Sequence, residues 1–174
     1  MDPGCCSYDD EDFSEYFKQS SNHTSMLVDG KGDSVLQGLY TWLAAPVCQV
    51  TPWKENSISS SMTSNAPGWE DVQWERKVEF QENSLQLTDK VSAPVEHEYT
   101  FNFALRSGVE CTRLDECKIL LSSGNVKVEA AFEYPVEIVD AKEFRNFVKL
   151  PAKKLVMKLK GAVSCVKTVF QVVD

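Results

Sequence analysis

Residues 99–105, with the sequence Tyr-Thr-Phe-Asn-Phe-Ala-Leu, alternate large apolar side chains with small or polar ones. Successive side chains of a β-strand point to opposite faces of a sheet, so this segment would place its aromatic rings on one face. Aromatic and β-branched residues are also enriched in strands. The segment therefore predicts a half-buried antiparallel strand whose aromatic face lies in a core.

The same two-residue period recurs along the chain from residue 72 onward. Groups of Ser, Gly, Asn and Pro separate the segments and are typical of turns. The alternating segments are 72–80, 85–91, 99–105, 126–132, 155–159 and 166–172, and the predicted turns include 82–84, 92–94, 107–108 and 122–125. This spacing predicts an all-β fold, an antiparallel β-sandwich of roughly ten or more strands. We expect one domain over residues 1–174, with a short helix only at 141–147.

The chain is acidic, with a net charge of −8 over 174 residues. An acidic surface repels polyanions, so we expect no nucleic acid partner held by bulk electrostatics. The densest basic group contains Lys153, Lys154, Lys158 and Lys160, and we interpret it as a solvated strand edge. No apolar run is long enough for a membrane span. The first residues lack the basic start and apolar stretch of a secretory signal, so we expect neither a membrane segment nor a signal peptide.

Six cysteines occur at positions 5, 6, 48, 111, 117 and 165. Their spacing matches no zinc pattern, because positions 111 and 117 are too far apart and positions 5 and 6 are adjacent. We interpret them mostly as thiols. A disulfide between Cys111 and Cys117, across a short loop, stays open as an alternative.

Residues 1–33 contain an Asp-Pro-Gly turn, a tyrosine-containing connection and a histidine just before an apolar strand. This order resembles a segment of the heparinase II/III-like polysaccharide lyases, in which such a turn, a Tyr-rich connection and a His-Asn-Thr-like element lead into V-D-G-x-G-Q. The sequence departs from that pattern at residues 22–24, which are Asn-His-Thr, and at Asp33, where the family usually has Gln. The matching residues are Asp2, Pro3, Gly4, Tyr8, Tyr16, Phe17, Ser20, His23, Thr24, Val28, Asp29, Gly30, Lys31 and Gly32.

The later strands continue the resemblance to about residue 132. In the family's C-terminal sandwich an Arg-x-Val-x-Phe strand precedes a hairpin to Leu-x-Leu-x-Asp-x-Val, which residues 76–80 and 85–91 match. A strand with a His or Tyr ahead of alternating aromatic residues follows, and residues 97–103 match it. Each piece alone is common in β-proteins, so the order of the pieces carries the resemblance.

The resemblance implies a role in degrading acidic polysaccharides that contain uronate, of the glycosaminoglycan or alginate type, by β-elimination. A base removes the proton next to the uronate carboxyl group, whose charge must be neutralised while the glycosidic oxygen leaves. In the family most of these groups lie on a preceding α/α toroid, which is absent from this chain. We therefore expect a C-terminal β-sandwich that forms one wall of the substrate cleft and is inactive alone. The parent protein would be secreted, periplasmic or lumenal.

Three residues of the first segment form the candidate site that the resemblance implies. In some relatives a zinc ion is held by the Asp of the turn, the His before the V-D-G strand and a His on a strand absent here. Asp2 and His23 would then be two zinc ligands, and Tyr8 would line the cleft and act in proton transfer. The alternatives are a turn residue for Asp2, an exposed histidine for His23 and a surface tyrosine for Tyr8. We expect the second histidine, His97, at the surface.

A function of a different class is a non-catalytic β-sandwich that binds carbohydrate or protein. Sugar-binding faces use exposed aromatic rings, so the tryptophans rather than His23 would then matter. Two or more exposed tryptophans in a row would favour this alternative. The chain has Trp42, Trp53, Trp69 and Trp74.

Overall fold

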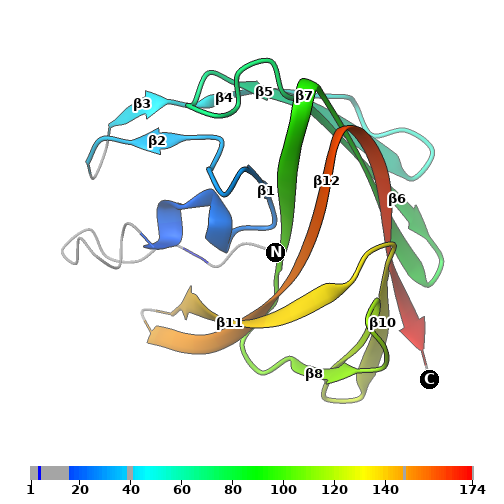
Figure 1. The fold of residues 1–174 in the computed structure, drawn as a ribbon. Helices are drawn as coiled ribbons and strands as arrows, with labels where there is room; N and C mark the ends of the chain where they lie inside the picture. Colours follow the sequence, from blue (N-terminus) through cyan, green and yellow to red (C-terminus); the bar gives the residue numbers. More distant parts are fainter. Residues whose placement is uncertain (1–3, 5–15, 39–40, 147, 174) are drawn as a thin grey trace.

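The computed structural model describes residues 4, 16–38, 41–146 and 148–173, and β-strands dominate it (Figure 1). A short 3-10 helix, η1 (Ser20–Asn22), comes before the strands. The strands are β1 (Met26–Val28), β2 (Val35–Leu36), β3 (Trp42–Ala44), β4 (Pro46–Val50), β5 (Ser57–Ser64), β6 (Gln73–Gln81), β7 (Ser84–Ala104), β8 (Glu110–Arg113), β9 (Lys118–Ser123), β10 (Val126–Phe132), β11 (Val136–Arg145) and β12 (Val148–Val173). The predicted all-β class is confirmed.

Ten of the described strands form one antiparallel sheet, in the order β4-β5-β6-β7-β12-β10-β9-β8. β1 joins this sheet beside β7, and β11 joins it beside β12. β2 and β3 form a separate two-stranded sheet. The large sheet bends strongly, so that its parts enclose a common interior (Figure 1). This arrangement agrees with the predicted sandwich of roughly ten or more strands.

β7 and β12 are the long strands that connect the parts of the sheet (Figure 1). Residues 84–92 of β7 pair with β6 and with residues 163–171 of β12, whereas residues 97–104 pair with residues 154–161. The register shifts between Gly161 and Val163, and residues 93–96 have no partner in this ladder. The predicted turn at 92–94 is therefore wrong. Pro94, which has no backbone N–H to donate, lies among the residues of this continuous strand that have no partner in the ladder.

The core lies inside the bent sheet, and the aromatic face of β7 is at its centre. Tyr99, Phe101 and Phe103 are each at most 3% exposed, as the alternation predicts. Phe101 contacts Trp74 of β6 edge-on, with ring centroids 6.4 Å apart. Phe103 contacts Phe132 of β10 in the same way, at 5.4 Å. These edge-to-face pairs bring strands from different parts of the sheet into one core.

The expected helix at 141–147 does not form, because residues 136–145 belong to β11 and pair with β12 along their whole length. Among the described residues, no helix has the length and apolar character needed to cross a bilayer. The alternative disulfide is also not formed. The cysteines that the structure describes are all free thiols, at Cys48, Cys111, Cys117 and Cys165.

Candidate functional site

A tight turn follows β1 at residues 28–31. Val28 and Lys31 exchange both backbone hydrogen bonds, at 3.0 and 2.9 Å. The two residues between them have positive φ, 48° at Asp29 and 74° at Gly30. Positive φ at both central positions defines a type I′ turn, for which Asp-Gly is a favoured sequence. The Asp-Gly pair of the V-D-G motif therefore forms the centre of this turn.

The carboxylate of Asp29 fastens this turn to β7. His97 Nδ1 lies 2.7 Å from Asp29 Oδ2, and the backbone N–H of Glu98 donates to Asp29 Oδ1 at 2.9 Å. The hydrogen bond from His97, followed by that from Glu98, lowers the pKa of Asp29 below its ordinary value. The side chain of His97 is only 14% exposed. His97 therefore lies near the surface, as expected, but its imidazole is held by the turn and is only partly exposed.

The segment after the turn is fixed by polar contacts from distant residues. The buried indole of Trp69 donates from Nε1 to the carbonyl of Lys31 at 3.1 Å. Ser20 Oγ and Ser34 Oγ both donate to Asp33 Oδ1, the latter at 3.0 Å. A Cβ at Gly32 would lie 2.7 Å from Ser20 Oγ. Glycine at this position therefore allows Ser20 to pack closely against the loop.

The 16–22 segment is anchored to the sheet by aromatic packing. Phe17 is 3% exposed and contacts Tyr16 edge-on at 5.0 Å and Phe144 of β11 at 6.1 Å. The hydroxyl of Tyr16 accepts a hydrogen bond from the backbone of Lys142 at 3.0 Å. Tyr16 and Phe17 are thus packing residues. Their contacts fix the position of the segment that leads to His23.

His23 lies between this segment and β1, and it is partly buried. His23 Nε2 lies 2.7 Å from the carbonyl oxygen of Phe17. An imidazole nitrogen is one of the donor types that zinc binds. Among the described residues there is no group of three His, Cys, Asp or Glu side chains that could hold a metal ion. Asp2 and Tyr8, the other two predicted site residues, lie outside the described residues.

Lys154 is a partly buried cation near His23 that the sequence did not single out from its neighbours. Its Nζ donates to the carbonyl of Ser21 at 2.6 Å. Burial lowers the pKa of this lysine below its ordinary value. The interpretation of the basic group as a solvated strand edge is therefore wrong for Lys154, whereas Lys158 and Lys160 are exposed.

A hollow of about 310 Å³ lies beside these residues, and we name it the Trp42 groove. Its walls come from the η1 region, from the loop after β1 and from the β2–β3 pair, which lie on the same side of the molecule in Figure 1. Trp42 is 43% exposed. The groove is lined by Lys18, Gln19, Ser20, Ser21, Leu27, Gly30, Gly32, Ser34, Val35, Leu36 and Trp42.

Comparison with protein families gives a match over residues 1–164 to the family described as "Heparinase II/III-like, C-terminal". The chain belongs to this family. The resemblance that the turn, the histidine and the ordered strands carry is thereby confirmed. A search of curated proteins finds no match.

Solved structures of heparinases have the same fold as this heparinase II/III-like domain. The crystal structure of heparan sulfate lyase HepC from Pedobacter heparinus matches 95% of this chain with a TM-score of 0.72 and 11% identity. A crystal structure of heparinase III matches 99% of it with a TM-score of 0.71 and 13% identity. The match covers 26% and 27% of those two chains, so this chain spans about a quarter of their length.

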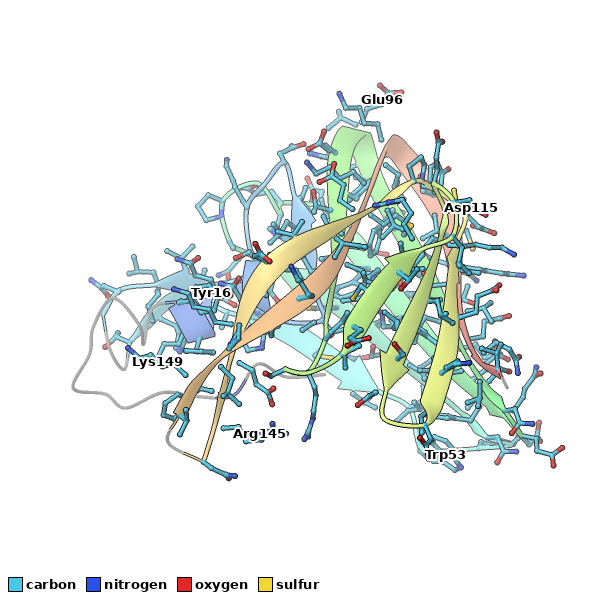
Figure 2. All side chains as sticks on the ribbon, turned by 90° about the horizontal axis from the view of Figure 1, so that it is seen from below. Tyr16, Trp53, Glu96, Asp115, Arg145 and Lys149 are labelled. Carbon is cyan, nitrogen blue, oxygen red and sulfur yellow. The ribbon has the colours of Figure 1, made fainter. Side chains whose placement is uncertain are left out.

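The tryptophans of this heparinase II/III-like domain are not arranged in a row. Trp69 is fully buried and Trp74 is 8% exposed. Trp53 is 54% exposed and packs on Phe80, with ring centroids 5.3 Å apart. Figure 2 shows Trp53 on a different side of the molecule from Tyr16, which belongs to the segment beside the Trp42 groove. One exposed tryptophan therefore lies in the groove, and the other lies elsewhere.

Proposed function

We propose that this chain is the C-terminal β-sandwich of a polysaccharide lyase that cleaves uronate-containing polysaccharides by β-elimination. The observation that supports it best is the family match over residues 1–164. Heparan sulfate lyase HepC and heparinase III also carry this fold as about a quarter of a longer chain. In the whole enzyme the sandwich would form one wall of the substrate cleft, opposite the helical toroid.

The chemistry of β-elimination explains why this domain would be inactive alone. The reaction needs a base at the carbon next to the carboxyl group, and donors that stabilise the enolate as it forms. These groups must surround one sugar ring from both walls of a cleft. The proposed contributions of this chain are Tyr8, in proton transfer, and the residues around His23. The base and the groups that neutralise the carboxylate would come from the toroid.

The test of this function is an elimination assay with two proteins. The isolated chain is incubated with heparan sulfate, chondroitin and alginate, and the ultraviolet absorbance of the unsaturated uronate product is followed. We expect no product from this chain. We expect product when a helical toroid encoded upstream in the same reading frame is included. Robust product from the isolated chain would contradict the proposal that it is inactive alone, and the absence of a toroid upstream would contradict the lyase proposal.

We also propose that Asp2 and His23 supply two ligands of a zinc ion, with the third on a strand outside this chain. The support is the donor set, since a carboxylate oxygen and an imidazole nitrogen both suit zinc. A zinc ion there would join the Asp-Pro-Gly motif to the segment before β1. The test is metal analysis of the purified protein, with Asp2→Ala and His23→Ala expected to lower bound zinc. The control is His97→Ala, since this histidine is held by Asp29; equal zinc in all the variants would contradict the proposal.

A binding module without catalysis is the second candidate function, and the position of Trp42 favours it. An exposed indole beside serine hydroxyl groups suits sugar recognition, whether or not a catalytic domain is attached. Binding of oligosaccharide by this chain, combined with no elimination by any longer form of the protein, would establish this alternative.

A further inference from the structure

The stretch from Ser34 to Trp53 contains no charged residue, although 25% of the chain is charged. This stretch contains β2, β3 and β4. Several of its large apolar side chains face solvent: Leu43 is 63% exposed, Val47 64% and Val50 61%. Exposed apolar side chains that gather in one region mark an interaction surface. The uncharged stretch is therefore a candidate surface for a partner.

β4, within this stretch, forms one edge of the large sheet. Among the described strands it pairs with β5 alone. Just after β4, the backbone N–H of Thr51 donates to the carbonyl of Ser59 at 2.9 Å, so the backbone groups of Thr51 face β5. Alternate residues of an antiparallel strand turn their backbone groups to opposite sides, so those of Gln49 also face β5. The N–H and C=O groups of Cys48 and Val50 consequently point toward the free edge.

The free edge of β4 lacks the charged side chains that usually prevent one sheet from pairing with another. β8, at the opposite edge of the same sheet, has Glu110 and Arg113 at its two ends. β4 has the sequence Pro-Val-Cys-Gln-Val, which carries no charge. Its proline is the first residue, so the outward N–H groups of Cys48 and Val50 remain able to donate. The edge can therefore accept a further strand.

A second copy of this chain fits this edge. Two identical antiparallel strands are related by a two-fold axis, so each copy presents the same groups to the other. The chain has a net charge of −8, and two copies repel each other least where their contact surface is uncharged. Pairing about Gln49 joins Cys48 of one copy to Val50 of the other through two backbone hydrogen bonds. The two-fold axis repeats this pair, so each outward N–H of Cys48 and Val50 finds an acceptor.

We propose that two copies of this chain associate by antiparallel pairing of their β4 strands, with Gln49 facing Gln49 across the two-fold axis. The large sheet then continues from one copy into the other. Cys48 of each copy packs against Val50 of the other, on the face that also bears Met62. The two Gln49 amides meet on the opposite face. This inference is independent of the proposed function, because β4 contains no residue of the candidate site.

The test is sedimentation equilibrium of the full chain over a range of concentrations, with charges introduced at position 49. Gln49→Lys and Gln49→Glu should each raise the dissociation constant of the dimer about fivefold, because like charges then lie directly opposite each other. An equimolar mixture of the two variants should regain the affinity of the parent chain, because opposite charges then meet. The matched control is Gln81→Lys, at an exposed position of β6, which should leave the dissociation constant unchanged.

Disulfide trapping tests the register. In the proposed register the two residues at position 49 form a non-hydrogen-bonded pair, whose Cα atoms lie about 4.5 Å apart. This separation is within the range of about 4.4–6.8 Å that a disulfide requires. Gln49→Cys in a Cys48→Ser background should therefore give a covalent dimer when the thiols are oxidised with diamide. Cys48→Ser alone is the control for the other cysteines and should remain monomeric on a non-reducing gel.

Four outcomes would overturn the proposal. They are a parent chain that stays monomeric at every concentration, a mixture of the charge variants that does not regain affinity, an equal loss in Gln81→Lys, and no trapped dimer through position 49. Unchanged circular dichroism and melting temperature establish that each variant is folded; should a charge variant fail this check, the trapping result decides. Each of these outcomes leaves the lyase proposal standing, because elimination is measured in the longer protein.

Discussion

The buried ion pair between Arg76 and Asp89 is expected to dominate the stability of the sheet around β6 and β7. Arg76 donates from Nε to Asp89 Oδ1 at 2.7 Å and from Nη2 to Oδ2 at 3.0 Å. The indole of Trp74 donates to the same Oδ1 at 2.7 Å. The Asp89 side chain is 1% exposed and that of Arg76 12%. Three donors therefore converge on one carboxylate that water hardly reaches.

Removing one partner should cost more than removing both. Asp89→Leu leaves a buried guanidinium and the Trp74 N–H without their acceptor, and breaking a buried pair in this way costs about 3–5 kcal/mol. For a chain of 174 residues, this corresponds to a loss of roughly 10 °C in melting temperature. Arg76→Met should cost a similar amount, because the carboxylate then stays buried with the indole alone. The double variant should be more stable than either single variant, since apolar replacement of both charges is often neutral. It still leaves the buried Trp74 N–H without an acceptor, so it should remain about 1–3 kcal/mol less stable than the parent.

The assay is equilibrium unfolding in urea, followed by tryptophan fluorescence and circular dichroism, for the two single variants and the double variant. The control is Glu79→Gln on the exposed pair of Lys77 and Glu79, which should leave the free energy of unfolding nearly unchanged. A loss below about 1 kcal/mol in Asp89→Leu would refute the reasoning. So would a double variant as unstable as the sum of the two single ones, because the network would then contribute packing rather than charge compensation.

Three further predictions concern the loop after β1. The His97 hydrogen bond is the main cause of the lowered pKa of Asp29. The ionised Asp29 carboxylate therefore stabilises the fold above the ordinary carboxyl pKa, and this stabilisation is lost as pH falls through the lower pKa of the folded state. The difference in urea midpoint between the parent and Asp29→Asn should therefore shrink in acid; a difference independent of pH would contradict this origin. Gly30→Ala places a Cβ at φ 74° and should cost about 1–2 kcal/mol by urea unfolding, and an unchanged midpoint would exclude the type I′ turn. Trp69→Phe removes the donor to the Lys31 carbonyl and buried volume, so it should cost about 2 kcal/mol or more by thermal unfolding; a neutral result would show that this indole does not hold the loop.

Much of the sheet follows from the alternation in the sequence, because a two-residue period records which face of a strand is buried. Residues 126–132 are predicted and observed as β10 with the same bounds. The turn expected at residues 92–94 is wrong. Proline occurs both in turns and in strand segments that have no ladder partner, and the sequence does not distinguish these two cases. The helix expected at 141–147 is wrong because pairing with β12 outweighs the local preference of Ala, Lys and Glu for helix.

The candidate site was less accessible to prediction, because its contacts join residues far apart in the chain. Asp29 and His97 are 68 positions apart, and no local pattern signals that a turn carboxylate will hold an imidazole on another strand. The burial of Lys154 depends likewise on the segment around Ser21, which packs across the chain. Trp42 and Trp53 are both apparent in the sequence, yet only tertiary structure shows that one faces a groove and the other packs on Phe80.

The length of β12 has a consequence for biosynthesis. Since β12 pairs with β7, β10 and β11, the central ladder cannot close until residues 148–173 have emerged from the ribosome. Until then the nascent chain holds β7 with an unsatisfied edge and an aromatic face open to solvent, a state prone to association with other chains. Such long-range closure is slow. Chaperone protection during synthesis should therefore matter more for the yield of this domain than for that of a protein built from local hairpins.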